Sequence, residues 1–355
     1  LFAGIGGFRL GMESAGHECI GFCEIDKFAR ASYKAIHDTK GEIELHDITA
    51  VSDESIRRIG RVDIICGGFP CQAFSIAGAR RGFEDTRGTL FFEIARFASI
   101  LRPQYLFLEN VKGLLNHENG ITFETIISTL DELGYDVEWQ VLNSKDFGVP
   151  QNRERVFIIG HFRGECTRRI FPLSGQSQSI SNKSVVKIGN VNPSGNGMNG
   201  EVYQADGLAP TLTTNKGEGQ KIAIKSNTIK QFGVLQPNFN QCGVVYETDG
   251  IAPTIRAYQG GGLEPKIIQR GHGYNKGGVH EIAPTLTSNS YHENNHLSFG
   301  YRIRKLTPRE CWRLQGFPDW AFDKAQEVNS NSQLYKQAGN SVTVNVIAAI
   351  AKELE

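Results

Sequence analysis

Strand-like apolar runs alternate with helix-like patterns from position 1 to position 160 of the 355-residue chain, and this alternation limits the possible folds more than any other feature. The runs "HECIGFCEID", "VDIICGG", "YLFLEN" and "RVFIIG" are typical of strands, whereas "KFARASYKAIH", "LFFEIARFASIL" and "ITFETIISTLDEL" have helical spacing. This order predicts an α/β fold with a doubly wound sheet. Such sheets bind ligands at the carboxyl ends of their strands, so we expect "LFAGIGGF", "EID", "FPCQ" and "LEN" at one edge.

Residues 161–300 have a different composition, with 20 of the 40 glycines, many Asn and Ser, and little helical periodicity. We predict a smaller, loop-rich, mostly β domain there. It contains three related segments: "VYQADGLAPTLTTN" from 202, "VYETDGIAPTIRAY" from 245 and "VHEIAPTLTSN" from 279. Their "APT" triplets begin at Ala209, Ala252 and Ala283, and these two intervals are too unequal for a regular solenoid. Duplicated recognition segments are favoured, and a repeated scaffold is the alternative.

The last part of the chain, from "YRIRKLTPRECWRLQGFP" onward, is helical in pattern and ends in the apolar helix of "QAGNSVTVNVIAAIAKEL". We expect this tail to return to the first domain. The predicted division is a first domain of residues 1–172 plus 335–355, a second domain of 173–300 with the three repeats, and a hinge and connecting segment of 301–334.

Charge and cysteine content exclude several classes of protein. The 38 Lys and Arg balance 38 Asp and Glu, so no bulk attraction to nucleic acid or anionic membranes is expected. Seven scattered cysteines without a C-x-x-C pair favour a reducing cytoplasm and predict neither a disulfide framework nor a metal site. No apolar run approaches the length of a membrane-spanning helix, roughly 18 residues, and no leader peptide is visible, so we expect no membrane span. The chain begins at Leu1, and we expect residues upstream of it.

A glycine turn, "AGIGG" at residues 3–7, follows the first apolar run. Arg9 occupies the place of the last glycine in the G-x-G-x-x-G dinucleotide motif, so that motif is incomplete. Glu24 lies at the end of the next strand, where a carboxylate commonly binds a ribose diol. Together they indicate an adenosine-containing cofactor, and the alternative is a tight turn followed by a solvated acid.

Cys71 in "GGFPCQAFS" has three possible roles: a small buried residue, a metal or disulfide partner, or a nucleophile at the tip of a strand. Pro70 fixes the backbone, and the preceding glycines permit close approach of another chain. Only about 3% of an ordinary thiol is ionised at neutral pH, so a nucleophile needs activation. The candidate activating groups are Arg80, Arg81, Arg153 and Arg155.

Glu109 ends the apolar strand "LFLEN". It could be a solvated strand terminus. In a cleft beside Cys71 it could instead have a raised pKa and act as a general acid.

The ordered motifs resemble those of the bacterial and phage DNA cytosine-5 methyltransferases over nearly the whole chain. "LFAGIGGFRLG" resembles their cofactor loop, "GFPCQAFSIAG" their nucleophile loop, "ENV" their acid and "QNRERVFIIG" their paired arginines, while "RKLTPREC" and "QAGNSV" resemble their closing motifs. The resemblance implies a Rossmann-like, S-adenosylmethionine-dependent catalytic domain, a target-recognition domain that contains the repeats, and a restriction-modification type of activity.

The resemblance also implies the residues that bind S-adenosylmethionine. One departure is Ile25, which stands where many relatives carry Trp against the adenine. The implied cofactor-binding residues are Phe2, Gly4, Ile5, Gly6, Gly7, Glu24, Ile25, Asp47, Ile48, Pro70, Leu90, Asn340 and Val342.

In the implied chemistry, Cys71 adds to C6 of a cytosine rotated out of the duplex, which makes C5 nucleophilic. Glu109 provides the proton at N3, Asn110 positions Glu109, and Arg155 binds the base carbonyl, with Arg153 beside it in the paired-arginine motif. Arg256 is a candidate for contact with a guanine edge, and Gln241 stands where a relative fills the vacated space. The implied DNA-binding residues are Gln72, Ser75, Gln241, Thr254, Arg256, Tyr258, Gly260 and Gly261.

Four rival functions fit less well. A transfer-RNA methyltransferase of the same superfamily would not be expected to carry three repeats, and a catalytically silent DNA-binding protein should have lost Cys71 or Glu109. A zinc deaminase requires H-x-E with P-C-x-x-C, and Arg9 disfavours an NAD dehydrogenase. We therefore expect a monomeric, cytoplasmic enzyme whose partner is double-stranded DNA, with a cognate restriction endonuclease acting on the same site.

Overall fold

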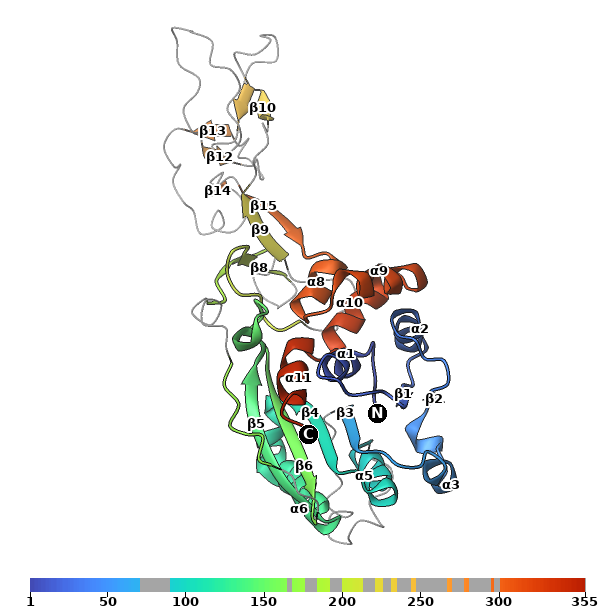
Figure 1. The fold of residues 1–355 in the computed structure, drawn as a ribbon. Coiled ribbons are helices and arrows are strands. Elements are labelled where there is room, and N and C mark those ends of the chain that lie inside the picture. Colours follow the sequence, from blue (N-terminus) through green and yellow to red (C-terminus); the bar gives the residue numbers. More distant parts are fainter. Residues whose placement is uncertain are drawn as a thin grey trace. The chain divides into compact units, whose positions relative to one another are not determined.

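The computed structural model describes residues 1–70, 90–164, 168–175, 184–191, 200–212, 221–225, 231–234, 244–246, 267–269, 278–280, 295–296 and 301–354. The chain forms two compact units (Figure 1). The first unit contains Leu1–Val185, Gly207–Gly219 and Leu306–Glu355, and the second contains Val186–Asp206 and Gln220–Lys305. The three-part division predicted from the sequence stays a prediction.

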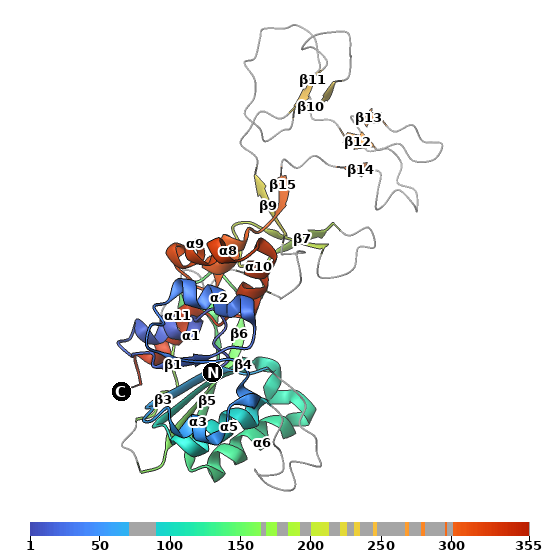
Figure 2. The same ribbon diagram turned by 90° about the vertical axis from the view of Figure 1, so that its right-hand side faces the viewer.

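The first unit is built on a central sheet. Four of its strands lie in the order β3 (Ile64–Gly68), β4 (Tyr105–Val111), β6 (Glu154–Phe162) and β5 (Tyr135–Asn143). The β3–β4 pair is parallel, whereas β6 runs antiparallel to both of its neighbours. A parallel pair of β1 (Gly21–Cys23) and β2 (Ile43–Leu45) lies beyond β3. Figure 1 shows β1 and β2 next to β3, and Figure 2 shows the four-stranded sheet in a view turned by 90°.

The first three residues of the chain connect these two sets of strands. The terminal amine of Leu1 donates to the carbonyl of Cys66 in β3 at 2.6 Å, and the amide of Ala3 donates to the carbonyl of Cys23 in β1 at 2.9 Å. The layer therefore runs β2, β1, residues 1–3, β3, β4, β6, β5, and the glycine turn at residues 4–7 leaves from its centre.

Helices cover both faces of the sheet, as the alternation predicted. Leu106, Leu108 and Ile158 pack on one face beneath α3 (Asp53–Arg57), α5 (Leu90–Leu101) and α6 (Ile121–Glu132). Tyr105, Phe107 and Ile159 pack on the other face against α1 (Gly7–Glu13) and α11 (Val344–Ala351). Strand β4 is buried on both faces, which explains why its sequence is a continuous apolar run. Each fully buried aliphatic side chain contributes about 1.5–3 kcal/mol.

The remaining helices of the first unit are α2 (Lys27–Ile36), α8 (Pro308–Leu314), α9 (Asp319–Val328) and α10 (Asn331–Asn340). Helix α8 begins with a capping box between Thr307 and Glu310 and has Pro308 in its first turn. Trp312 of α8 is fully buried and contacts the ring of Phe322 in α9. The hydroxyl of Ser32 donates to Gln337 at 3.0 Å, which fastens α10 to α2. Short 3₁₀ segments lie at Ile48–Ala50, Lys112–Gly120 and Ser144–Phe147.

The described residues of the second unit lie mainly in strands, and the three repeats begin at equivalent places in them. The "VY" or "VH" of the repeats lies on β8 (Glu201–Gln204), β11 (Val244–Tyr246) and β13 (Gly278–His280). Each of these strands is antiparallel to the strand before it: β7 (Lys187–Asn190), β10 (Gln231–Val234) and β12 (Ile267–Gln269). The other strands are β9 (Lys221–Lys225), β14 (Asn295–His296) and β15 (Tyr301–Lys305).

The seven strands and helices predicted in the first part of the chain are present. Strand β5 was not predicted, although the structure describes it as one of the two longest strands of the sheet. Among the helices that the structure describes, none is long and apolar enough to cross a membrane.

Candidate active site

Four predicted segments meet at the carboxyl edge of the sheet. Gly68 at the end of β3 is the register partner of Glu109 near the end of β4. A Cβ atom added to Gly68 would lie 3.0 Å from the Glu109 carboxylate and 3.9 Å from both Phe8 and Val342. The backbone of β3 can approach the carboxylate this closely because Gly68 has no side chain. The glycines before "FPC" were predicted to permit a close approach of another chain, and the group that approaches Gly68 is the Glu109 carboxylate.

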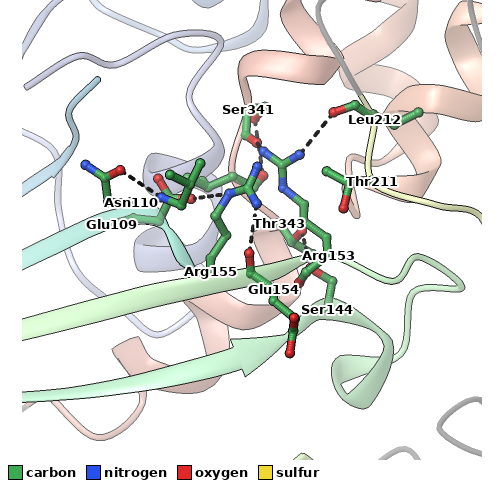
Figure 3. Close-up of polar contacts among 12 residues, drawn as sticks. Glu109, Asn110, Ser144, Arg153, Glu154, Arg155, Thr211, Leu212, Ser341 and Thr343 are labelled. Carbon is green, nitrogen blue, oxygen red and sulfur yellow. Dashed lines mark hydrogen bonds and ion pairs between the residues drawn. The ribbon is translucent and has the colours of Figure 1, made fainter. Parts of the chain in front are cut away.

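Glu109 is a buried carboxyl group that forms an ion pair with Arg155. It is 8% exposed, and its Oε1 lies 3.0 Å from Nε of Arg155 on β6 (Figure 3). Burial raises the pKa of Glu109 because desolvation penalises the charged carboxylate more than the arginines stabilise it. A proton is therefore held more tightly here than on an exposed glutamate, which is what a general acid requires.

The two arginines of the "RER" sequence have different contacts. Arg155 is opposite Val111 in the sheet register, and its Nη1 donates to the carbonyl of Glu154 at 2.8 Å. Arg153 is only 3% exposed, and its Nη2 donates to the carbonyl of Ser341 at 2.8 Å and to that of Gly339 at 3.3 Å. Arg155 thus faces the carboxylate, whereas Arg153 holds the turn that follows α10 (Figure 3).

Asn110 fixes the backbone that leads to the predicted nucleophile. Its Nδ2 donates to the carbonyl of Phe69 at 2.9 Å, and its Oδ1 accepts from the amide of Val111 at 2.8 Å. The side chain is 2% exposed, and both polar atoms of its amide group therefore have a hydrogen-bond partner. Cys71 follows Phe69 by two positions and lies outside the described residues, as do Gln72, Ser75, Gln241, Thr254, Arg256, Tyr258, Gly260 and Gly261.

The glycine turn is held by Glu24. Oε2 of Glu24 accepts from the amide of Gly4 at 2.8 Å, and Oε1 accepts from the amide of Asp26 at 2.8 Å. Phe2, Gly4 and Gly6 all have positive φ, at 52°, 57° and 86°. Among the residues that the structure describes, none would lie within 4 Å of a Cβ atom on Gly4, so these residues leave the space above the turn open.

His37 supports the turn from beneath. A Cβ atom on Gly6 would lie 2.0 Å from Nε2 of His37, and this nitrogen lies 3.4 Å from the carbonyl of Ile5. Burial, with a further contribution from the charge of Arg9, lowers the pKa of His37 to about 4. The ring is therefore neutral near pH 7 and packs against the glycine. His37 was not predicted, because no sequence motif identifies it.

The other predicted cofactor residues have mixed environments. Asp47 caps the 3₁₀ segment that begins at Ile48 by accepting from the amide of Thr49 at 3.0 Å. Ile25 is 66% exposed beside Glu24, and Asn340 is exposed at the end of α10. Pro70 is exposed, and Phe2, Gly4 and Leu90 are half-buried. The other predicted cofactor residues are buried: Ile5, Gly6, Gly7, Ile48 and Val342.

A cavity of about 380 Å³ lies at the opposite ends of the strands, lined by residues such as Ile20, Ile43 and Ile64. Gly6 is the only one of the predicted site residues within the described ranges that lines it. Glu109, the two arginines and Glu24 do not line this cavity, so we do not assign the active site to it.

Solved structures show which fold this is. A DNMT2 mutant from Spodoptera frugiperda matches with a TM-score of 0.57 and 20% identity, covering 99% of this chain and 97% of that one. The Dnmt2 methyltransferase of S. pombe matches with a TM-score of 0.58 and 16% identity, covering 98% and 94%. The fold is that of these methyltransferases, and the predicted division into a catalytic domain and a smaller, mostly β domain stays a prediction.

Sequence comparison identifies the family within that class. The model of the C-5 cytosine-specific DNA methylases matches residues 1–355, and the chain belongs to this family. It is 36% identical to the orphan methyltransferase M.SPRI of Bacillus phage SPR, over 100% of this chain and 96% of that one. It is 37% identical to the type II methyltransferase M.HhaI of Haemophilus parahaemolyticus, over 99% and 91%. The predicted function, a DNA (cytosine-5-)-methyltransferase, is confirmed.

Proposed function

We propose that this enzyme methylates C5 of a cytosine rotated out of double-stranded DNA, with Cys71 as nucleophile and S-adenosylmethionine as methyl donor. The observation that carries the proposal is the buried pair of Glu109 and Arg155 at the end of β4, 3.0 Å apart. Asn110 beside them holds the carbonyl of Phe69, two positions before Cys71. An acid, a cation and the beginning of the nucleophile loop therefore lie at one edge of the sheet.

The proposed reaction begins with bond formation between the Cys71 sulfur and C6 of the cytosine. The proton of Glu109 moves toward N3, which makes C5 enamine-like and able to take the methyl group. After C5 has taken the methyl group, a base removes the proton from C5, and the electron pair restores the C5–C6 double bond. The C6–sulfur bond breaks, Cys71 leaves as a thiolate, and the proton on N3 returns to Glu109. Arg155 binds the base carbonyl and stabilises the negative charge that develops there.

The residues at the glycine turn fit an adenosine-containing sulfonium cofactor. The space above Gly4 is open, the Glu24 carboxylate lies beside it, and Ile25 offers an exposed apolar surface for the adenine. When bound, S-adenosylmethionine supplies the methyl group. We assign its ribose to Glu24 and its amino-acid part to the backbone of Gly4 and Gly6 and to the turn at Asn340 and Val342.

We assign sequence recognition to the second unit, which contains the second and third repeats and the start of the first. Thr254, Arg256 and Tyr258 of the second repeat are proposed to contact bases, and Gly260 and Gly261 the DNA backbone. Gln72 and Ser75 are proposed to contact DNA from the nucleophile loop, and Gln241 to fill the space that the rotated base leaves. The proposed enzyme is a cytoplasmic monomer with a restriction endonuclease of the same site specificity.

The test is a covalent trap. DNA with 5-fluorocytosine at the target should form a denaturant-stable adduct with the wild type, since fluorine at C5 blocks release of the cysteine. Cys71→Ser should abolish both the adduct and methyl transfer while keeping cofactor and DNA binding. The control is Cys19→Ser, which changes a half-buried thiol and should leave both unchanged.

Other thiols are poor alternatives as nucleophiles. Burial raises the pKa of Cys23 to about 11 and the pKa values of Cys66 and Cys311 to about 12, so these groups stay protonated. An adduct that survives Cys71→Ser, or a serine variant with full activity, would rule out the proposed mechanism.

A further inference from the structure

The first of the three repeats contains a connection that belongs to a different unit from its flanking strands. Strands β8 and β9 lie in the second unit and pair in parallel, with Val202 opposite Lys221. The connection between them, Gly207–Gly219, belongs to the first unit. Its described residues, 207–212, include the "APT" triplet of the first repeat, and we call them the docked segment.

The docked segment is bound to the turn that precedes Arg153. The amide of Ala209 donates to the carbonyl of Pro150 at 2.9 Å, and the amide of Asn152 donates to the carbonyl of Ala209 at 2.8 Å. The hydroxyl of Thr211 donates to the carbonyl of Asn152 at 2.8 Å. Main-chain and side-chain groups of the triplet therefore already have partners within the first unit.

Burial of two leucines makes the attachment more than a surface contact. Leu208 is 2% exposed and Leu212 is 6% exposed, so the side chains on either side of the triplet lie in the interior. The amide of Leu208 also donates to the carbonyl of Ser184 at 3.0 Å. Apolar burial and hydrogen bonds thus fix the same short segment.

Arg153 connects the docked segment to the candidate site. Its Nη1 donates to the carbonyl of Leu212 at 3.4 Å, while its Nη2 holds the carbonyls of Ser341 and Gly339 (Figure 3). Gly339 and Ser341 alternate along the chain with Asn340 and Val342, which we assign to cofactor binding. Arg155, two positions along β6, is paired with Glu109.

We infer that the docked segment is a positioning element for Arg153 and for the turn after α10, and that the "APT" triplet of the first repeat does not read bases. The inference rests on the proposed function. The three repeats start at equivalent strands, yet this triplet is committed to contacts beside the catalytic strand. Base reading is then left to the second and third repeats.

Thr211→Val tests this inference, because valine keeps the shape of threonine and removes the hydroxyl. This hydrogen bond to the carbonyl of Asn152 is exposed, and loss of such a bond corresponds to about a two- to tenfold effect. We expect kcat to fall by that factor at every methylated sequence, with the preference between sequences unchanged. Thr211→Ser, which retains the hydroxyl, should restore the rate. Thr211→Ala provides the same test if the valine variant folds poorly.

Thr254→Val and Thr285→Val are the matched comparisons in the other repeats. Methylation of a duplex library with randomised sites should show altered base preference for these variants and none for Thr211→Val. A changed base preference in Thr211→Val, or an unchanged kcat, overturns the inference.

Calorimetry separates this inference from the proposed function. Thr211→Val should raise the Kd for S-adenosylmethionine by about threefold or more, since the turn at Asn340 and Val342 loses its support through Arg153. A wild type that binds the cofactor and does not methylate DNA would refute the proposed function alone. An unchanged Kd in Thr211→Val would refute the positioning role even if the wild type is active.

Discussion

Arg153 and Arg155 illustrate how two residues of one type acquire different roles through burial and partners. They are two positions apart: Arg153 directly precedes β6, and Arg155 lies within it. Arg155 reaches the carboxylate of Glu109, and Arg153 reaches three main-chain carbonyls. Lysine cannot copy either set of contacts, because an ammonium group lacks the planar fork of the guanidinium. The motif identifies the pair, and only the fold separates their contacts.

Glu109→Gln should change the free energy of unfolding in a pH-dependent way. Burial raises the pKa of Glu109 above its value in the unfolded chain, so the wild type loses stability as pH rises through the folded-state pKa. The variant has no such loss. The free energy of unfolding of the variant minus that of the wild type should therefore increase as the pH rises through the folded-state pKa of Glu109. Urea titrations at a series of pH values measure this difference. The unpaired Arg155 shifts the whole curve without changing this slope.

Asp319→Asn provides a control of opposite sign. Hydrogen bonds from Arg313 lower the pKa of Asp319, so the wild type gains stability as pH rises through the acidic range. The difference between this variant and the wild type should become more negative with pH. Equal slopes for Glu109→Gln and Asp319→Asn would contradict the assigned environment of Glu109.

At the scale of elements, Gly6 of the glycine turn affects both the stability of the fold and the binding of the cofactor. Gly6 and Gly16 both have positive φ, at 86° and 95°, but a Cβ atom on Gly6 would meet His37 at 2.0 Å, whereas Gly16 has open space. Gly16→Ala should cost about 1–2 kcal/mol from backbone strain alone. Gly6→Ala should cost about 3 kcal/mol or more, because the clash is added.

Urea unfolding and calorimetry measure the two parts of this prediction. Gly6→Ala should also weaken S-adenosylmethionine binding, since displacement of the turn moves the amide of Gly4, while Gly16→Ala should bind the cofactor normally. Equal losses of stability in the two variants would show that His37 yields to the added methyl group.

Sequence patterns predicted the elements that are continuous apolar runs or have helical spacing. The alternating "YDVEWQV" of β5 is also typical of a strand and was not used, and it would place the wrong side chains inside, because Glu138 is buried whereas Trp139 is 47% exposed. The structure shows why: Glu138 accepts from the amide of Ile170 at 2.7 Å, and Gln140 accepts from the amide of Leu173 at 2.8 Å. These side chains replace a neighbouring strand's carbonyls, and no local pattern shows that a segment so distant in the chain needs them.

The candidate site was predictable to a similar extent. Glu24, Glu109 and Asn110 end strands, and strand ends meet at one edge, so their proximity followed from the fold class. His37, Gly68 and the carbonyls held by Arg153 act through backbone contacts between distant segments. Such contacts depend on packing and leave no signature in residue type.

At the scale of the whole molecule, the repeats decide how many sequences the enzyme can recognise. If the second and third repeats form one composite reader, Thr254→Ala with Arg256→Ala and Thr285→Ala with Thr287→Ala should both depress methylation of the same motif. Loss of a bidentate guanine contact corresponds to about a tenfold or larger decrease. We expect this composite behaviour in genome-wide bisulfite sequencing of cells that express each variant. Selective loss of a different motif in each double variant would instead establish independent readers.

The first unit is assembled from parts that are far apart in the chain. Helix α11 packs on α1 so closely that a Cβ atom on Gly11 would lie 2.6 Å from Ile347. A ribosome that adds about 5–20 residues per second needs roughly 20 to 70 seconds to travel from one helix to the other. Once Phe107 and Ile159 have been made, they lack the cover that α11 provides at the end of this interval. The nascent chain therefore presents an apolar surface to the chaperones of the cell that makes it until the last helix emerges.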